Sequence, residues 1–451
     1  MRASVAAVLR NSISALGVAV TTACAVIFAV LLLAELAGLL ENPYTGLVTF
    51  VLLPVLFVLG LLLIPVGLLI ERRKARTSVA PPAWPRLDFN DPNIRRTVLF
   101  VAGATIVNLV ILSVASYGAV EYTESQQFCG EVCHGTMEPQ YASYQSWPHA
   151  RVACAACHVG PGAGALVESK LAGARQLLYV ATGRVPRPIP SPVESLRPAR
   201  ETCERCHWPE KFHGERIRAI SEFASDEANS ETVTTLRLHV GGGSRPLGIG
   251  TGIHWHMNLD NEIEYIATDA TRETIPYVRL RDRDGNVREF VVPGTTPDEL
   301  AAGTRRRMDC MDCHNRPAHT FHPTPERAVD AAMAQGRIPR ELAFARREAV
   351  AAISAEYADR TAALDGIARR LREFYGRHDG TDPRLLQRAV AGAQDAWSRN
   401  VFPAMHVTWG TYPNQLGHLD APGCFRCHDD QHKASDGTVI RQDCELCHAF
   451  E

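Results

Sequence analysis

The sequence lacks both a net charge and an extended basic run. It has 47 Lys and Arg residues against 49 Asp and Glu residues in a chain of 451, which gives a formal net charge of −2. Proteins that bind nucleic acids usually carry a basic surface that neutralises phosphates. We therefore expect no nucleic-acid partner, and the function has to be sought in particular residues.

Unpaired cysteines are also nearly absent. Of the thirteen cysteines, only Cys24 stands alone, in an apolar run where it is most simply a small buried residue. The other twelve form six pairs, and a histidine directly follows each pair. The six motifs are Cys129/Cys133-His134, Cys154/Cys157-His158, Cys203/Cys206-His207, Cys310/Cys313-His314, Cys424/Cys427-His428 and Cys444/Cys447-His448.

Five of these motifs have the spacing C-x-x-C-H, which is the attachment motif of c-type haem. The two thiols bind the porphyrin covalently, and the histidine is the proximal ligand of the iron. Zinc sites and disulfides would not need a histidine after each pair, and a thioredoxin-like motif would occur once. We predict six haem c groups, although the first motif has an extra residue that should change how His134 is seated.

Three long apolar runs precede the first motif, at residues 13–40, 47–70 and 98–120. Each exceeds the length of about 20 residues that a helix needs to cross a bilayer. A signal peptide would have a shorter apolar core and would not be followed by two further spans. Residues 1–120 are therefore predicted to be a membrane anchor with three transmembrane helices.

Basic residues lie on one side of these spans. Arg2 and Arg10 precede the first span and several Arg residues lie in the 71–97 loop, whereas the turn after the first span has none. The positive-inside rule then places the N-terminus in the cytoplasm and everything after residue 120 in the periplasm of a bacterial inner membrane. Haem is attached to c-type cytochromes on that side, so topology and motifs agree.

The rest of the chain predicts a multihaem cytochrome c fold, mainly α-helical and irregular, whose core is filled by haem. Segments between the early motifs are short and rich in Pro and Gly, so they cannot bury a large side-chain core. Alternating residues at about 232–293 predict a small β insertion, and helical spacing predicts two or three antiparallel helices within 324–400. The predicted periplasmic domains are 121–323, 324–400 and 401–451.

The first four motifs and their spacing resemble the NapC/NirT/NrfH family of membrane-anchored tetrahaem quinol dehydrogenases. The resemblance spans roughly residues 121–322. This chain differs in having three apolar runs instead of one, an extra residue in the first motif and two further motifs. The resemblance therefore implies an extended six-haem member.

The resemblance also implies distal iron ligands. His149, five residues before the second motif, would serve the fourth haem, and His319, five residues after His314, would serve the third. Lys170 would ligate the second haem, and Met137 would ligate the first. For the last two haems we consider the nearest histidines, with others held in reserve. The candidates are His418 and His432, and the reserves are His254, His256 and His406.

These features predict an electron-transfer protein that oxidises menaquinol or ubiquinol at the outer membrane surface, close to the third span. Its quinol-site candidates are Lys170, Met137, Glu168 and Glu138, of which the carboxylates would accept a proton. Electrons would pass to a periplasmic cytochrome or reductase, and the extra spans suggest a membrane partner subunit. Two alternatives are a reductase of a small nitrogen oxyanion and electron delivery into the quinone pool.

Overall fold

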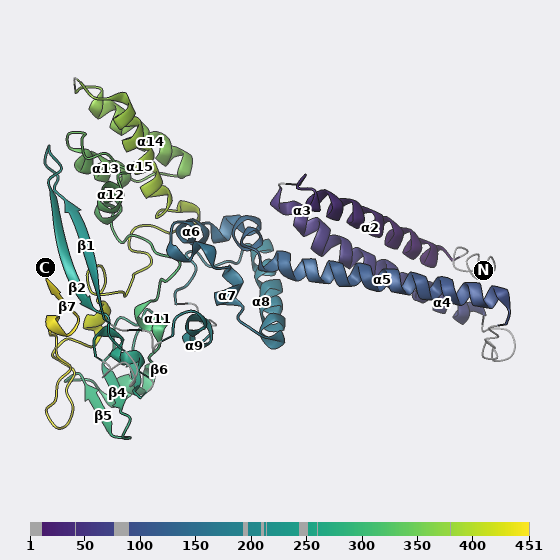
Figure 1. The fold of residues 1–451 in the computed structure, drawn as a ribbon, viewed down its shortest axis with the longest axis horizontal. Coiled ribbons are helices and arrows are strands. Elements are labelled where there is room, and N and C mark those ends of the chain that lie inside the picture. Colours follow the sequence, from purple (N-terminus) through teal and green to yellow (C-terminus); the bar gives the residue numbers. More distant parts are fainter. Residues whose placement is uncertain are drawn as a thin grey trace. The chain divides into compact units, whose positions relative to one another are not determined.

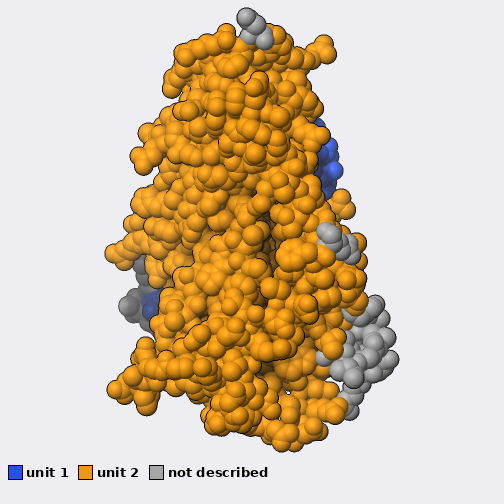
Figure 2. All heavy atoms as spheres, turned by 90° about the vertical axis from the view of Figure 1, so that its left-hand side faces the viewer, with its two compact units in different colours: residues 1–134 blue, residues 135–451 orange. Residues whose placement is uncertain are grey.

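The computed structural model describes residues 11–40, 42–75, 90–192, 197–208, 212, 214–242, 251–258, 260–378 and 380–450. Arg2, Arg10 and most of the 71–97 loop, which entered the orientation argument, lie outside these residues. The chain divides into two compact units, residues 1–134 and 135–451, which are coloured separately in Figure 2. Each unit is described by itself.

The first unit contains three helices that are long and apolar enough to cross a membrane, as predicted. They are α2 (Ser12–Leu36), α4 (Leu53–Ala75), which continues from α3 (Pro43–Leu47) and the π-turn η1 (Val48–Leu52), and α5 (Pro92–Glu124) (Figure 1). The third helix runs past the predicted end of its apolar segment and stops five residues before Cys129.

Small residues let α2 and α4 approach closely. A methyl group added at Gly17 would lie 2.7 Å from the carbonyl oxygen of Gly60, and one added at Gly60 would lie 2.5 Å from the Thr21 hydroxyl oxygen. The Ser14 hydroxyl also donates a hydrogen bond of 2.9 Å to the Ile64 carbonyl. Close packing of backbones through small residues is the usual way in which helices associate in lipid, where burial of apolar surface gives no driving force.

The second unit has two antiparallel sheets. The first has the strand order β1-β2-β7, and the second has the order β5-β4-β3-β6 (Figure 1). Their bounds are β1 Glu215–Phe223, β2 Glu231–His239, β3 Glu262–Ala267, β4 Tyr277–Arg281, β5 Val287–Val291, β6 Thr304–Arg307 and β7 His448–Phe450. The β region is therefore larger than the predicted insertion at 232–293.

The sheets position two of the haem motifs. Strand β7 begins at His448 and pairs with β2, so the last motif is held against the β1–β2 hairpin. Strand β6 ends three residues before Cys310 and pairs with β3, so the fourth motif follows directly from the second sheet. The core of this sheet includes Tyr265 and Val278.

Residues 325–398 form four helices, not the two or three that we expected. They are α12 (Pro325–Ala334), α13 (Ala345–Ile353), α14 (Arg360–Tyr375) and α15 (Pro383–Ser398), packed around a core that includes Ile353, Ile367 and Trp397. The break after α12 occurs at Gly336, whose φ of +68° favours glycine and ends the helix.

Short helices carry the motifs and link these parts. They are η2 Phe128–Val132, α6 His134–Gln145, η3 Pro148–Arg151, α7 Cys154–His158, α8 Ala163–Ala181, α9 Ala199–Thr202, η4 Cys203–Arg205, η7 Ile253–Met257, α10 Pro297–Ala302, α11 Cys310–Cys313, η8 Pro403–Met405, η9 Gly423–Arg426 and η10 Cys444–Leu446. The architecture agrees with the predicted class, which combines three N-terminal apolar helices with a mainly helical and irregular second part that contains small sheets.

Candidate haem-binding site

Each of the five C-x-x-C-H motifs folds into a single helical turn. These turns are α7, η4, α11, η9 and η10. In several of them the backbone N–H of the motif histidine donates to the carbonyl of the first cysteine, as from His207 to Cys203 and from His314 to Cys310, both at 2.8 Å. Residues three apart lie on one side of such a turn. Both thiols of a motif can therefore reach the same porphyrin edge.

The first motif accommodates its extra residue in a wider turn. Residues Phe128–Val132 form the π-turn η2, in which hydrogen bonds join residues five apart. This turn brings Cys129 and Cys133, which are four apart, towards the same side. Burial raises the pKa of the Cys133 thiol. The side chain of His134 lies outside the described part of the structure.

The other five motif histidines each face a second imidazole from elsewhere in the chain. The distances between ring centroids are 6.2 Å for His158 and His319, 6.1 Å for His207 and His149, 6.2 Å for His314 and His254, 5.8 Å for His428 and His256, and 6.2 Å for His448 and His418.

This spacing fits an iron atom held between two imidazoles. Metal–imidazole bonds are about 2.0–2.1 Å long, and a ring nitrogen lies about 1.1 Å from its centroid, so two axial rings would have centroids about 6 Å apart. Aromatic rings in contact also have centroids about 4.5–7 Å apart, so the stronger observation is that each pair joins a motif histidine to a histidine outside the motifs. The donor set and the spacing therefore both fit haem c with two axial histidines.

Backbone carbonyls hold several of these rings in one tautomer. The Nδ1 atoms of His149, His319, His254 and His256 lie 2.8, 2.9, 3.0 and 2.7 Å from main-chain carbonyl oxygens. The Nδ1 atom of His428 lies 2.9 Å from the Arg441 carbonyl. Donation from Nδ1 leaves Nε2 as the unprotonated nitrogen, which is the one that can bind a metal.

Burial also keeps these imidazoles neutral. It lowers the pKa values of His254 and His256 below the usual value for histidine. Burial, with smaller contributions from neighbouring positive groups, lowers the pKa of His319 to about 4. Only the neutral imidazole has a lone pair for iron, so these surroundings favour the ligating form.

The second, third and fourth motifs lie next to one another in the second unit. Burial raises the pKa of the Cys157 thiol, and nearby sulfur atoms, including Cys203 and Cys206 of the third motif, raise it further. Interaction between the side chains of Cys203 and Cys310 lowers the pKa of the first thiol and raises that of the second, which places the third motif beside the fourth.

Neighbouring cysteines also connect the fourth, fifth and sixth motifs. Burial raises the pKa of Cys313 to about 12, with a further contribution from Cys424 of the fifth motif. Burial raises the pKa of Cys447 to about 11, again with a contribution from Cys424. The five C-x-x-C-H motifs therefore follow one another in space in the order in which they occur in the sequence.

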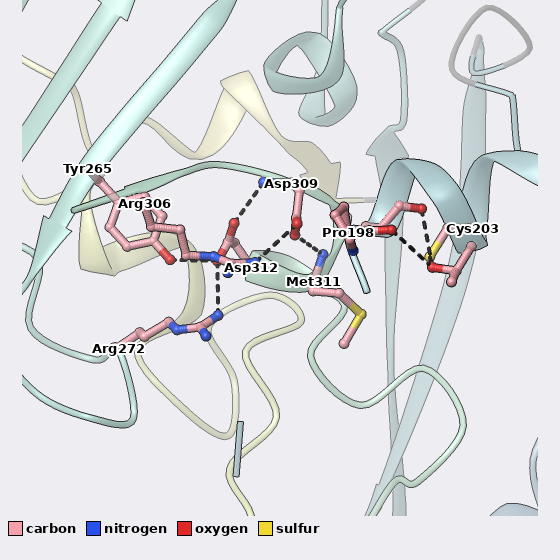
Figure 3. A network of polar contacts seen from close by, with 10 residues as sticks. Pro198, Cys203, Tyr265, Arg272, Arg306, Asp309, Met311 and Asp312 are labelled. Atoms are coloured by element: carbon pink, nitrogen blue, oxygen red, sulfur yellow. Dashed lines mark hydrogen bonds and ion pairs between the residues drawn. The ribbon is translucent and has the colours of Figure 1, made fainter. Parts of the chain in front are cut away.

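A buried carboxylate fixes the fourth motif to the second sheet (Figure 3). The Asp312 side chain is only 1% exposed and accepts hydrogen bonds from the Tyr265 hydroxyl at 2.5 Å and from Arg306 Nε at 3.0 Å. Arg272 lies 3.5 Å from the same oxygen, and the backbone N–H of Asp309 donates to the other oxygen at 2.7 Å. Burial and the Asp312 charge raise the pKa of Tyr265, so the hydroxyl remains a donor.

An arginine inside the fifth motif ties it to the fourth. Arg426 donates to the Asp312 carbonyl at 2.5 Å, to the Arg272 carbonyl at 3.0 Å and to the Gly423 carbonyl at 2.8 Å. A guanidinium that bridges three carbonyls restricts the relative movement of two neighbouring motifs.

The structure pairs the two family-derived distal histidines differently from the resemblance. His149 faces His207 of the third motif instead of His314 of the fourth, and His319 faces His158 of the second motif instead of His207. The place opposite His158 is thus taken by His319, where the resemblance had implied Lys170.

The remaining distal candidates separate into two groups. His254, His256 and His418 each face a motif histidine. His432 does not: it is 1% exposed, with Nδ1 2.8 Å from Asp429 and Nε2 2.7 Å from the Ile275 carbonyl, so both of its nitrogens are occupied. His406 is exposed and follows η8.

The quinol-site candidates lie on α6 and α8. Met137 is half-buried on α6, three residues after His134. Glu138, also on α6, forms an ion pair of 3.0 Å with Arg360. On α8, Glu168 is exposed and Lys170 is half-buried, and several apolar residues of this helix are strongly exposed, including Leu171 at 69%.

Sequence reasoning gave too little weight to four residues of this site. It ranked His254 and His256 as reserves because they are far from their partners in sequence, although their density in Gly252–Met257 was a visible signal. It gave no weight to Asp312 or Arg426, which occupy the variable positions inside two motifs. Their partners are brought by sheet pairing, which no local pattern reveals.

Comparisons with known proteins extend these observations. Residues 92–188 match the model of the NapC/NirT cytochrome c family, N-terminal region. The chain is 40% identical over 448 residues to the cytochrome c-type protein ImcH of Geobacter sulfurreducens, and the alignment covers 98% of this chain and 88% of that protein. No solved structure matches the chain.

Proposed function

The chain belongs to the NapC/NirT cytochrome c family, and on this premise we propose that it is a six-haem quinol dehydrogenase of the bacterial inner membrane. As a family member with three apolar helices, it is a membrane-anchored multihaem c-type cytochrome that transfers electrons. We further propose that it carries six haems, that it oxidises a quinol, that its second unit lies in the periplasm and that a periplasmic protein accepts the electrons. The main support for this proposal is that five motif histidines each face a second histidine.

The twelve paired cysteines would hold six haem c groups, with the six motif histidines as proximal ligands. The proposed distal ligands are His319, His149, His254, His256 and His418, for the second to the sixth haem in that order. Bound haem would supply one-electron redox chemistry at each iron. His432 and His406 are not assigned as ligands, because the first has both nitrogens occupied and the second is exposed.

The first haem would differ from the others in its distal ligand. This difference supports a role for the first haem as the one that accepts electrons from the quinol. Its candidate distal ligand is Met137, on the turn of α6 that follows His134. A thioether is a weaker iron ligand than imidazole, so this site would be the most open of the six.

The quinol would be bound by residues of α6 and α8. We assign Lys170 to orient the quinol oxygen by hydrogen bonding and Glu168 to accept a proton, because Glu168 is exposed and can release the proton to water. Glu138 remains a weaker candidate because it is paired with Arg360. Protons would leave on the periplasmic side, and electrons would exit at the sixth motif towards a soluble cytochrome or reductase.

The paired histidines favour this role over a reductase of nitrogen oxyanions. A reductase needs an iron with one free axial position for its substrate. Five of the six sites have an imidazole on each side, which suits electron transfer without substrate binding. A docking site for a second membrane subunit on the extra spans is compatible with the proposal.

Rapid mixing of the oxidised, detergent-solubilised protein with a menaquinol analogue tests the proposal. We expect haem reduction to be fast in the wild type and at least about tenfold slower in Lys170→Ala, since loss of one positioning hydrogen bond costs about 1.5 kcal/mol or more. Arg175→Ala, an exposed change on the same helix, is the matched control and should reduce at the wild-type rate. Reduction of menaquinone by the reduced protein, without the forward reaction, would mean that electrons flow inward.

A further inference from the structure

One buried arginine in the second unit has no anionic partner among the described residues. Arg316, two residues after His314, is 9% exposed, and its Nε atom is buried without a hydrogen-bond partner. Its guanidinium lies over the ring of Tyr412, 4.2 Å from the ring centroid. Arg346, by contrast, has Asp330 at 2.7 Å.

An unpaired buried guanidinium calls for an anion. Arginine stays protonated at any physiological pH, and its planar group presents several N–H donors in a fork that fits a carboxylate. A charge left unpaired inside a protein is strongly unfavourable, so such a group is normally neutralised by a neighbour or a ligand. A stacked tyrosine ring does not supply the missing negative charge.

The surroundings of Arg316 indicate where that anion would come from. Arg316 lies within electrostatic reach of His319, whose Nδ1 is bonded to the Gln140 carbonyl at 2.9 Å. The Gln140 side chain lies 3.5 Å from the Tyr412 hydroxyl, and its Oε1 atom is also buried without a partner. A flip of the Gln140 amide would place its N–H donors, instead of Oε1, at this buried position. Arg316 and Gln140, each with one buried unsatisfied atom, thus both contact Tyr412, and Gln140 also bonds His319 of the His158–His319 pair.

Haem carries two propionate carboxylates, which are anions of the required kind. We propose that Arg316, with Gln140 beside it, binds a propionate of the haem attached at Cys154 and Cys157. This inference rests on the proposed ligation of that haem by His158 and His319. Tyr412 would hold the guanidinium in position from its other face.

The bound propionate makes Arg316 a determinant of this haem's potential. Reduction adds one negative charge at the iron, so a nearby guanidinium favours the reduced state. Without the guanidinium, the carboxylate charge is no longer neutralised and the haem becomes harder to reduce. The change in reduction potential should be confined to this haem, because the surroundings of the other haems are not altered.

The test is a redox titration of the full-length, haem-loaded protein, followed by optical and EPR spectra of the individual haems. In Arg316→Leu we expect the reduction equilibrium constant of one low-spin haem to fall about tenfold, which is about 59 mV for one electron. Arg316→Lys should give a smaller shift in the same direction, because lysine keeps the charge and loses the fork. Arg347→Leu is the matched control: Arg347 also lies over an aromatic ring, 4.0 Å from Phe344, but has Glu348 at 2.8 Å.

A separate variant identifies the haem concerned. His319→Met should alter the EPR signal of the same haem that Arg316→Leu shifts. If six haems are attached and no potential moves in either Arg316 variant, the proposal is wrong. A shift confined to a different haem would overturn the assignment to the second motif. If His319→Met alters no haem, the ligand pairing itself fails, and this result is distinguishable from the other two.

Discussion

Main-chain carbonyls determine which nitrogen of the facing histidines is free. Each of His149, His254, His256 and His319 directs Nδ1 to a carbonyl oxygen, and this leaves Nε2 for the iron. His432 shows the opposite case, because protein oxygens lie beside both of its nitrogens. Proximity in sequence made His432 a candidate, whereas its hydrogen bonds decide against that role.

This contrast gives a direct prediction for two histidines. His256→Ala should convert one low-spin haem into a high-spin haem that binds carbon monoxide when reduced, because the fifth haem loses its distal ligand. His432→Ala should leave the number of low-spin haems unchanged. Magnetic circular dichroism of both variants checks the prediction. A new high-spin haem in His432→Ala alone would contradict the ligand assignment.

The buried Asp312 carboxylate gives a second prediction at this scale. Asp312→Asn removes the buried negative charge that faces Arg306 and Arg272. Arg306 keeps its ion pair with Asp309, whereas Arg272 loses its carboxylate. Loss of hydrogen bonds to a buried charged group costs about 1.5–3 kcal/mol, so the urea midpoint of unfolding should fall.

The control for this variant is Glu264→Gln in strand β3 of the second sheet. Glu264 pairs with Arg279 and Arg305 but is 24% exposed, and exposed pairs contribute about 0–1 kcal/mol. Equal losses of stability in the two variants would mean that the Asp312 network has no special role in holding the fourth motif.

At the scale of elements, the parts of the fold that depend on local patterns could be predicted from the sequence. The three spans follow from uninterrupted apolar runs, and the single-turn motifs follow from the C-x-x-C-H spacing. The β region was underestimated because the hairpin of β1 and β2 begins before the predicted alternating segment, and because the short β7 gains its partner from a distant segment. The distal histidines could not be paired correctly, because the pairing depends on how loops and sheets meet in three dimensions.

The packing of α2 against α4 gives a prediction for the anchor. Gly60→Leu should destabilise the anchor by about 1–3 kcal/mol, since its Cβ would lie 2.5 Å from the hydroxyl oxygen and 2.9 Å from the backbone nitrogen of Thr21. Gly103→Leu on α5 is the control, because nothing lies within 4 Å of a Cβ there among the described residues. Thermal unfolding in detergent should show a lower midpoint for Gly60→Leu only.

At the scale of the whole molecule, the two units divide the work of an electron carrier. The first provides three apolar helices that anchor the chain and ends in the first haem motif. The second holds five further motifs in spatial succession, fixed by sheet pairing and by Arg426. Five imidazole pairs of similar spacing suit the repeated, passive transfer of single electrons.

The haem content follows from this arrangement. The purified protein should contain six haem c groups per chain, measured by the absorbance of the pyridine complex against protein mass. Cys129→Ser with Cys133→Ser should contain five if the π-turn of the first motif binds a haem despite its extra residue, as we propose. Five haems in the wild type would show that the wider motif is not an attachment site.

The most direct test of the account is an anaerobic titration of the oxidised protein with menaquinol, in which reduced haem is measured after each addition. A quinol gives two electrons, so we predict that excess menaquinol reduces the haem chain through the first site and that about three quinols per chain are consumed for six haems. Absence of haem reduction by menaquinol, in a protein that dithionite reduces fully, would contradict the account.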